Sequence, residues 1–175
     1  MTRLPYSRPV AAGPEVGLLV PGSLPWTEVV GWAGRAEEAG AARVWVGPAR
    51  GASIVLAGAV GRRTSLRVGV VVPVGEVAAT VMAKHLNSLD VVIGGRLDVA
   101  LLGTPDEVTQ TAGVMRAMAS GQAVSGGARA LPAAVQQPGY PLWEAAAEPP
   151  KTDTAPGLPR GWLEAGLALV AVTPW

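Results

Sequence analysis

The stretch that decides the fold reads Met82-Ala83-Lys84-His85-Leu86-Asn87-Ser88-Leu89-Asp90 and, after Val91 and Val92, Ile93-Gly94-Gly95-Arg96-Leu97. Its first part has the composition and spacing of a helix, the glycine pair predicts a turn, and the apolar run 97–102 predicts a strand. A helix that leads through a tight turn into a buried strand is typical of a β-α-β unit. The stretch therefore predicts an α/β protein with a parallel sheet.

The segments on either side continue this alternation. The predicted strands are 16–20, 44–46, 66–72, 97–102, 142–147 and 167–172. The predicted helices are a segment from Trp26 up to Gly40, Ser53 to Val60, Val77 to Ser88, and Pro105 to Ser120. Thr104 is the expected N-cap of the last helix, where Asp106 and Glu107 favour the positive end of the helix dipole. Glycine and proline predict loops at 121–139 and 148–160.

Chain length and the positions of proline and glycine predict the domain organisation. A chain of 175 residues is most simply one domain with a substantial core. Residues 1–14 contain Pro5, Pro9, Gly13 and Pro14 and are predicted to form a flexible N-terminal segment. Residues 15–175 are predicted to form the single domain.

Composition excludes several classes of function. With 14 Lys and Arg against 13 Asp and Glu, the net charge of +1 gives no electrostatic reason to expect nucleic acid or an anionic membrane as partner. The lack of cysteine and the single histidine argue against disulfides and the usual metal clusters, so no metal site is predicted. No apolar run reaches the roughly 18 residues of a spanning helix, and a cytoplasmic protein is the expectation. The codon bias implied by abundant Ala, Gly, Pro and Val is typical of an actinobacterial genome.

The opening stretch resembles the central signature of the bacterial luciferase-like family of flavin- or deazaflavin-dependent oxidoreductases. The matching residues are Ala83, Lys84, Leu89, Asp90, Gly94, Gly95 and Arg96, with Ile93 where a serine is usual. Further segments resemble the family in the family's order, namely 36–46, 61–69, 141–146 and 161–163. Family members build an eight-stranded (β/α) barrel that typically needs about 250 residues. The resemblance therefore implies a truncated (β/α) TIM-barrel-like α/β fold with about six parallel strands alternating with helices.

The resemblance also indicates what the strand ends should carry, because barrels of this kind bind ligands at that face. After the second strand the family presents an acidic residue and a histidine, where this chain has Gly47-Pro48-Ala49-Arg50. After the fifth strand, where the family binds the cofactor phosphate, Ala147-Glu148-Pro149-Pro150 brings a carboxylate and two residues without N–H donors. We therefore expect no catalytic residue and an absent or weak cofactor, F420 or FMN if any.

Two places keep a potential for cofactor contact. Val72 and Pro73 end the third strand, where the family often carries a cofactor-facing bulge, and Gly103 and Thr104 follow the fourth strand, where the family has a glycine-rich turn.

The other prominent residues are expected to serve structure. These are Lys84, Asp90, Gly94, Gly95 and Arg96, with Asp90 approaching the turn amides of the two glycines and pairing with Arg96. His85 lies within a helix, which favours a surface or packing role. Trp26, Trp32 and Trp45 are expected to fill the core rather than to line a flavin cleft.

Two functions fit these expectations, and whether the chain is an enzyme stays open between them. The first is a non-catalytic or accessory subunit, a pseudoenzyme that supports a full-length flavin- or F420-dependent oxidoreductase in a heteromer. The alternative is a small active FMN- or F420-dependent oxidoreductase or monooxygenase whose site is completed by dimerisation. An unrelated α/β fold is the remaining possibility.

Both functions require a cover for the open barrel, because unpaired strand edges and exposed aliphatic side chains are costly. The candidates are a second copy, a full-length luciferase-like subunit, or the C-terminal run 167–175 folded back.

Overall fold

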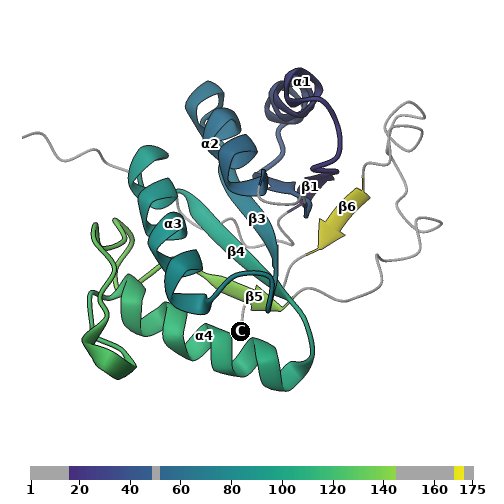
Figure 1. Cartoon of the computed structure of the whole chain (residues 1–175). Helices are drawn as coiled ribbons and strands as arrows, with labels where there is room; N and C mark the ends of the chain where they lie inside the picture. The colour runs from purple at the N-terminus through teal and green to yellow at the C-terminus, as the bar shows by residue number, and fades with distance from the viewer. Residues whose placement is uncertain (1–15, 49–51, 145–167, 172–175) are drawn as a thin grey trace, which may run out of the picture.

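The computed structural model of the chain describes residues 16–48, 52–144 and 168–171, so the predicted N-terminal segment 1–14 lies outside the described residues. Strands and helices alternate along most of this length (Figure 1). The elements are β1 (Val16–Val20), α1 (Trp26–Glu38), β2 (Arg43–Val46), α2 (Ser53–Arg63), β3 (Arg67–Pro73), α3 (Ala79–Val92), β4 (Leu97–Leu102), α4 (Pro105–Ala119), the 3-10 turn η1 (Ser125–Gly127), β5 (Leu142–Glu144) and β6 (Ala168–Ala171). The predicted β-α alternation is confirmed.

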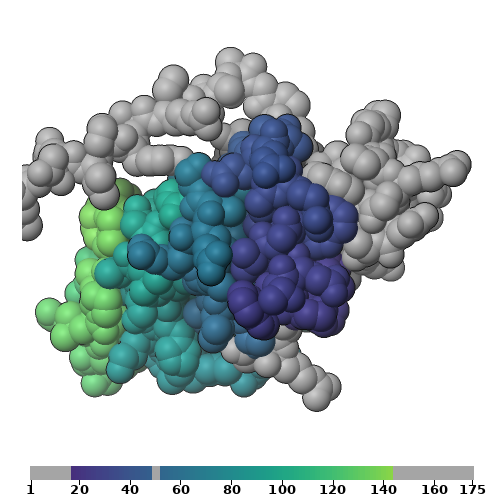
Figure 2. Space-filling view, turned by 90° about the horizontal axis from the view of Figure 1, so that it is seen from above, coloured from purple at the N-terminus to yellow at the C-terminus, as the bar shows by residue number. Residues whose placement is uncertain are grey.

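The strands form one sheet in the order β5-β4-β3-β2-β1-β6. Strands β1 to β5 run parallel to their neighbours, which confirms the predicted α/β fold with a parallel sheet. Helices α1 to α4 are arranged around one side of the sheet, and successive β-α units lie side by side from the N-terminal to the C-terminal end (Figures 1 and 2). This is the arrangement of a segment of a (β/α) barrel wall. Within the described residues, no helix has both the length and the apolar character that a membrane span requires.

The sixth strand is present, but it does not run in the predicted direction. β6 pairs antiparallel with β1, at the opposite edge of the sheet from β5. A parallel neighbour needs a crossover connection, and an apolar run carries no local signal for its direction, so the sequence could not distinguish the two arrangements. Residues 168–171 thereby supply hydrogen-bond partners to the β1 edge, which is one of the ways in which the C-terminal run was expected to act as a cover.

The main core lies between the sheet and the helices. Alternate strand residues point to this side, as the period of two requires. They include Val44 and Val46, Val68 and Val70, and Leu97, Val99 and Leu101, which are at most 1% exposed.

The opposite side of the sheet, here called the inner face, carries a second cluster. It consists of Trp45, Ala100 and Trp143, with Leu19 and Val71 packed against them. The rings of Trp45 and Trp143 meet edge to face, with centroids 6.3 Å apart and an interplanar angle of 86°. This geometry is favourable for aromatic pairs and joins β2 to β5 across the curved sheet.

The predicted core role of the tryptophans holds only in part. Trp45 is 2% exposed, but it fills the inner face rather than the helix side. Trp26 is 60% exposed at the start of α1, so its prediction as a core residue is wrong. Trp32 is partly buried and stacks against the Arg35 guanidinium at 3.8 Å. Helical spacing alone cannot tell a buried first turn from one that projects beyond the sheet.

Trp45 can lie flat on the inner face because β3 has a glycine beneath it. A Cβ atom at Gly69 would lie 2.1 Å from Trp45 Cε3, which is a steric overlap with a buried ring. The glycine is therefore required by close approach, not by backbone conformation.

Replacing Gly69 by alanine should lower the free energy of unfolding by about 2 to 4 kcal/mol, since the indole must shift within a packed cluster. The matched control is Gly34→Ala in α1, where an added Cβ meets no atom within 4 Å. That variant should gain about 0.5 to 1 kcal/mol from helix propensity. Urea unfolding followed by circular dichroism measures both. Equal stabilities for the two variants would contradict this packing.

The opening signature holds the sheet together through Arg96. Its guanidinium donates hydrogen bonds to the carbonyl oxygens of Gly61 (2.6 Å), Thr64 (3.0 Å), Leu66 (2.6 Å) and Ile93 (2.9 Å). These oxygens belong to the last turn of α2, the connection to β3, and the end of α3. One side chain therefore fixes two neighbouring helix-to-strand connections, from α2 to β3 and from α3 to β4.

The predicted pairing of Asp90 with Arg96 is wrong. The Asp90 carboxylate is fully buried and accepts hydrogen bonds from the backbone N–H of Val135 (2.7 Å) and Gln136 (3.1 Å) and from Gln136 Nε2 (2.9 Å). It therefore anchors the loop that follows α4. The turn glycines Gly94 and Gly95 have φ values of 69° and 76°, a conformation that favours glycine.

Arg96→Met should lower the free energy of unfolding by about 2 to 4 kcal/mol, because four carbonyl groups lose their donor while the apolar stem is kept. Arg62→Met, at an exposed position of α2, is the control and should change stability by less than about 0.5 kcal/mol. Denaturant midpoints of the two variants decide the matter. A mild effect at Arg96 would mean that the carbonyl groups find other donors.

Candidate functional site

The structure brings the four predicted cofactor-contact residues to one place. Pro73 of β3 is in register with Leu102 of β4, and the next N–H, of Val74, donates to the Leu102 carbonyl at 2.9 Å. The Val74 side chain lies over Gly103, where a Cβ would come within 2.0 Å of Val74 Cγ2. The carboxyl ends of β3 and β4 therefore form one continuous rim.

The four residues differ in what they offer at this rim. Val72 is 5% exposed and packs in the core on the helix side, so its side chain is directed away from the inner face. Pro73 is partly exposed and has no N–H to donate. Gly103 and Thr104 are exposed, at the start of α4.

The polar groups of Thr104 are already engaged by a neighbour on α4. Its backbone N–H donates to Glu107 Oε2 at 3.0 Å, and its hydroxyl donates to the same oxygen at 2.7 Å. The bond from the Thr104 N–H to the Glu107 carboxylate, together with the approach of the Glu107 backbone N–H to the Thr104 side chain, forms a capping box, which confirms Thr104 as the predicted N-cap. The side-chain and backbone hydrogen bonds from Thr104 hold the pKa of Glu107 below its ordinary value. The N-terminus of α4 thus carries a carboxylate in the position where a helix N-terminus would hold an anionic ligand.

A buried ionic cluster that sequence reasoning missed lies on the inner face at the other end of the strands. Asp98 is fully buried and contacts Arg67 through Nη2 at 2.6 Å and Nε at 3.0 Å, and Arg43 through Nη1 at 3.3 Å. The Arg43 guanidinium also lies 5.2 Å from the centre of the Trp143 ring. The sequence did contain a signal for this cluster, because Arg43 and Arg67 are the first residues of β2 and β3 and Asp98 is the second residue of β4. In a parallel sheet these positions meet at the amino ends, the end of a barrel associated with stability.

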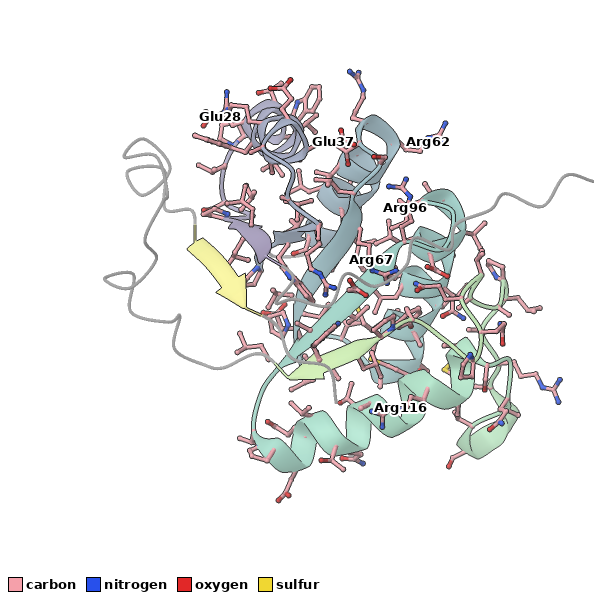
Figure 3. All side chains as sticks on the ribbon, turned by 180° about the vertical axis from the view of Figure 1, so that it is seen from behind. Glu28, Glu37, Arg62, Arg67, Arg96 and Arg116 are labelled. Atoms are coloured by element: carbon pink, nitrogen blue, oxygen red, sulfur yellow. The ribbon has the colours of Figure 1, made fainter. Side chains whose placement is uncertain are left out.

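The remaining singled-out residues lie away from the rim. Lys84 and His85 are exposed on α3, as expected for a surface role of the histidine. Figure 3 shows Arg67 and Arg96 near one end of the sheet, while Arg116 lies apart from both, on α4. Among the described residues, no group of histidines and carboxylates could hold a metal ion. The predicted strand-end segments 49–50 and 145–150 lie outside the described residues.

The fold and rim are those of a (β/α)-barrel segment whose ligand face would be the carboxyl ends of its strands. The profile of the family described as luciferase-like monooxygenase matches residues 9–119, and the chain belongs to this family.

Solved structures agree with this assignment at the level of the fold. The F420-dependent tetrahydromethanopterin reductase of Methanopyrus kandleri superposes with a TM-score of 0.68 and 13% identity, over 75% of this chain and 50% of that chain. The monooxygenase RslO1 of Streptomyces bottropensis gives 0.61 and 21%, over 70% and 47%. Apo-MsnO8 gives 0.56 and 20%, over 77% and 50%. The chain therefore spans about half the length of these structures. No curated protein matches it.

Thr104→Ala should raise the pKa of Glu107 toward its ordinary value of 4.5, because the hydroxyl donor is lost. In the native chain the lowered pKa of Glu107 means that the ionised carboxylate stabilises α4. This stabilisation is complete at a pH above the pKa of Glu107 in the unfolded chain, and it is lost as the pH falls through the pKa of Glu107 in the folded chain. The titration of the Glu107 carboxyl carbon by NMR measures the change. The control is Thr109→Ala, since that hydroxyl donates to the Pro105 carbonyl and not to Glu107. An unchanged titration in Thr104→Ala would contradict the capping box.

Proposed function

We propose that this chain is a non-catalytic luciferase-like subunit that supports a full-length flavin- or F420-dependent oxidoreductase. The observation that carries the proposal is the Glu107 carboxylate held on the Thr104 N–H and hydroxyl at the β4–α4 connection. FMN and F420 both carry phosphate, and a phosphate at this helix N-terminus would meet a carboxylate instead of unoccupied N–H donors. Asp106 adds a second negative charge in the same turn. The β4–α4 connection therefore does not fit the phosphate of either cofactor.

The strand ends themselves support the same interpretation. The residues that end or directly follow β1 to β4 are Pro21, Gly47, Pro73 and Gly103. Proline and glycine have no side chain that can transfer a proton, so these positions offer no general acid or base. The Gly47 N–H is also used, since it donates to the Val20 carbonyl at 2.8 Å.

The scaffold around this rim is nevertheless well packed. Arg96, the Trp45–Trp143 pair and the Asp98 cluster stabilise the sheet without taking part in any chemistry at the rim. A supporting subunit requires a stable barrel wall, and it does not require reactive groups at the ligand face. Its partner, in this proposal, is a luciferase-like protein that has its own cofactor site.

The isolated chain should leave the fluorescence of FMN and of F420 unquenched at micromolar concentrations. A full-length luciferase-like oxidoreductase under the same conditions is the positive control. Saturable micromolar quenching by the isolated chain would overturn the non-catalytic role and would favour the small active enzyme. In that event Glu107→Gln should bind more tightly than the native chain, because a repulsive charge is removed.

The partnership is tested separately by co-expression with a luciferase-like oxidoreductase from the same genome. Light scattering should find a heteromer, and the turnover or the cofactor retention of the oxidoreductase should increase in it. A chain that stays apart and leaves the oxidoreductase unchanged would count against the supporting role.

A further inference from the structure

The outer edge of the described fold carries a groove between α4 and β5. It consists of two adjoining hollows of about 560 Å³ and 90 Å³ that share Arg116, Leu142 and Trp143 as lining residues. Along α4 the lining extends from Val108 to Ser120, which corresponds to about 18 Å of helix. A groove of this length is long enough to lie against about three turns of another helix.

The groove is lined by one charged side chain that the described fold leaves without a partner. The Arg116 side chain is exposed and has no hydrogen bond or ion pair with the part of the chain that the structure describes. A partner that fills this groove must therefore bring a carboxylate for the guanidinium.

The same helix face supplies that carboxylate. Asp106, Thr109, Gly113 and Arg116 follow one another at spacings of three, four and three residues, so they form one stripe along α4, and all four are exposed. The Asp106 side chain also has no hydrogen bond or ion pair with the described residues. Asp106 and Arg116 lie about 15 Å apart at opposite ends of the stripe.

This stripe is complementary to itself when two copies of α4 lie antiparallel. The midpoint of the stripe lies between Thr109 and Gly113, so a two-fold axis that crosses the stripe there places each Asp106 opposite the Arg116 of the second copy. Thr109 then faces Gly113, where a Cβ would meet no atom within 4 Å and a second backbone can approach closely. Antiparallel helices also have favourably opposed dipoles.

We propose that the α4–β5 groove is a self-association surface, occupied by α4 of a second copy of this chain. The interface is isologous, with two Asp106–Arg116 ion pairs related by the two-fold axis. Each pair seats at the edge of the groove, and the N-terminal half of one α4 covers the apolar lining beside Arg116 of the other. The inference does not depend on the proposed function, since it requires no cofactor and no other protein.

The test is a charge exchange read by sedimentation velocity and light scattering of the full chain. The native protein should form a dimer of twice the 17.8 kDa chain mass. In a dimer of the Arg116→Asp variant, an aspartate faces an aspartate at both places where an ion pair formed. In a dimer of the Asp106→Arg variant, an arginine faces an arginine at both places. Each variant alone should raise the dimer dissociation constant about tenfold or more. An equimolar mixture of the two should recover a heterodimer within about threefold of the native affinity, because both ion pairs form again.

The controls reverse exposed charges on the early helices. Glu28→Arg in α1 and Arg62→Asp in α2 change the net charge by the same amounts and should leave dimerisation unchanged. Circular dichroism of each variant verifies folding, and recovery in the mixture excludes misfolding as the cause of dissociation. A monomeric native chain, a dimer that withstands both α4 variants, or a mixture that fails to associate would each overturn the proposal. Weakening by the α1 and α2 variants instead would assign the dimer to those helices.

Discussion

The described fold depends most directly on the hydrogen bonds that Arg96 donates to four backbone carbonyl groups. Helix ends leave carbonyl oxygens without intrahelical donors, and two such ends, of α2 and α3, meet beside the start of β3. A guanidinium has enough donors, in a rigid planar arrangement, to satisfy several of them at once, which an ammonium group could not do in the same geometry. Because both connections are fixed, β3 and β4 take a defined register, and that register is what brings Pro73 beside Leu102 at the rim.

A second polar network extends this order to the outer edge of the sheet. Asp90 holds the backbone of Val135 and Gln136, and the Gln136 side chain reaches the Leu97 carbonyl at 2.7 Å and Arg67 at 3.2 Å. Burial, with Asp90 nearby, raises the pKa of Tyr140 and keeps its hydroxyl neutral. The loop after α4 is thereby positioned so that β5 pairs with β4 and the α4–β5 groove is formed. The α4–β5 groove therefore depends on the Asp90 carboxylate of α3, which holds the loop that leads into β5.

The two ends of the strands have opposite electrostatic characters. At the amino ends a buried Asp98 is balanced by Arg43 and Arg67, so charge is used to hold three strands together. At the β4 carboxyl end, Glu107 is turned back on its own helix and Asp106 lies beside it on the exposed side. The charged groups at the amino ends of the strands thus hold the strands together. At the carboxyl end of β4, Glu107 caps α4 and Asp106 is exposed.

The sequence by itself determined the α/β class, the order of elements and, for β4 and α4, nearly the observed bounds, because these follow from local apolar periodicity and from capping residues such as Thr104. The resemblance carried by 83–96 gave the barrel-wall fold. Tertiary structure alone decided the antiparallel direction of β6, the exposure of Trp26, the partner of Asp90, the Arg43–Arg67–Asp98 cluster and the groove beside α4. Each of these depends on which distant segments meet, and a buried charge or an indole is stabilised by partners that no spacing along the chain specifies. Local secondary-structure preference depends on neighbouring residues. The hydrogen-bond partners of buried polar groups and the close packing of side chains depend instead on remote residues that the sheet brings within contact distance.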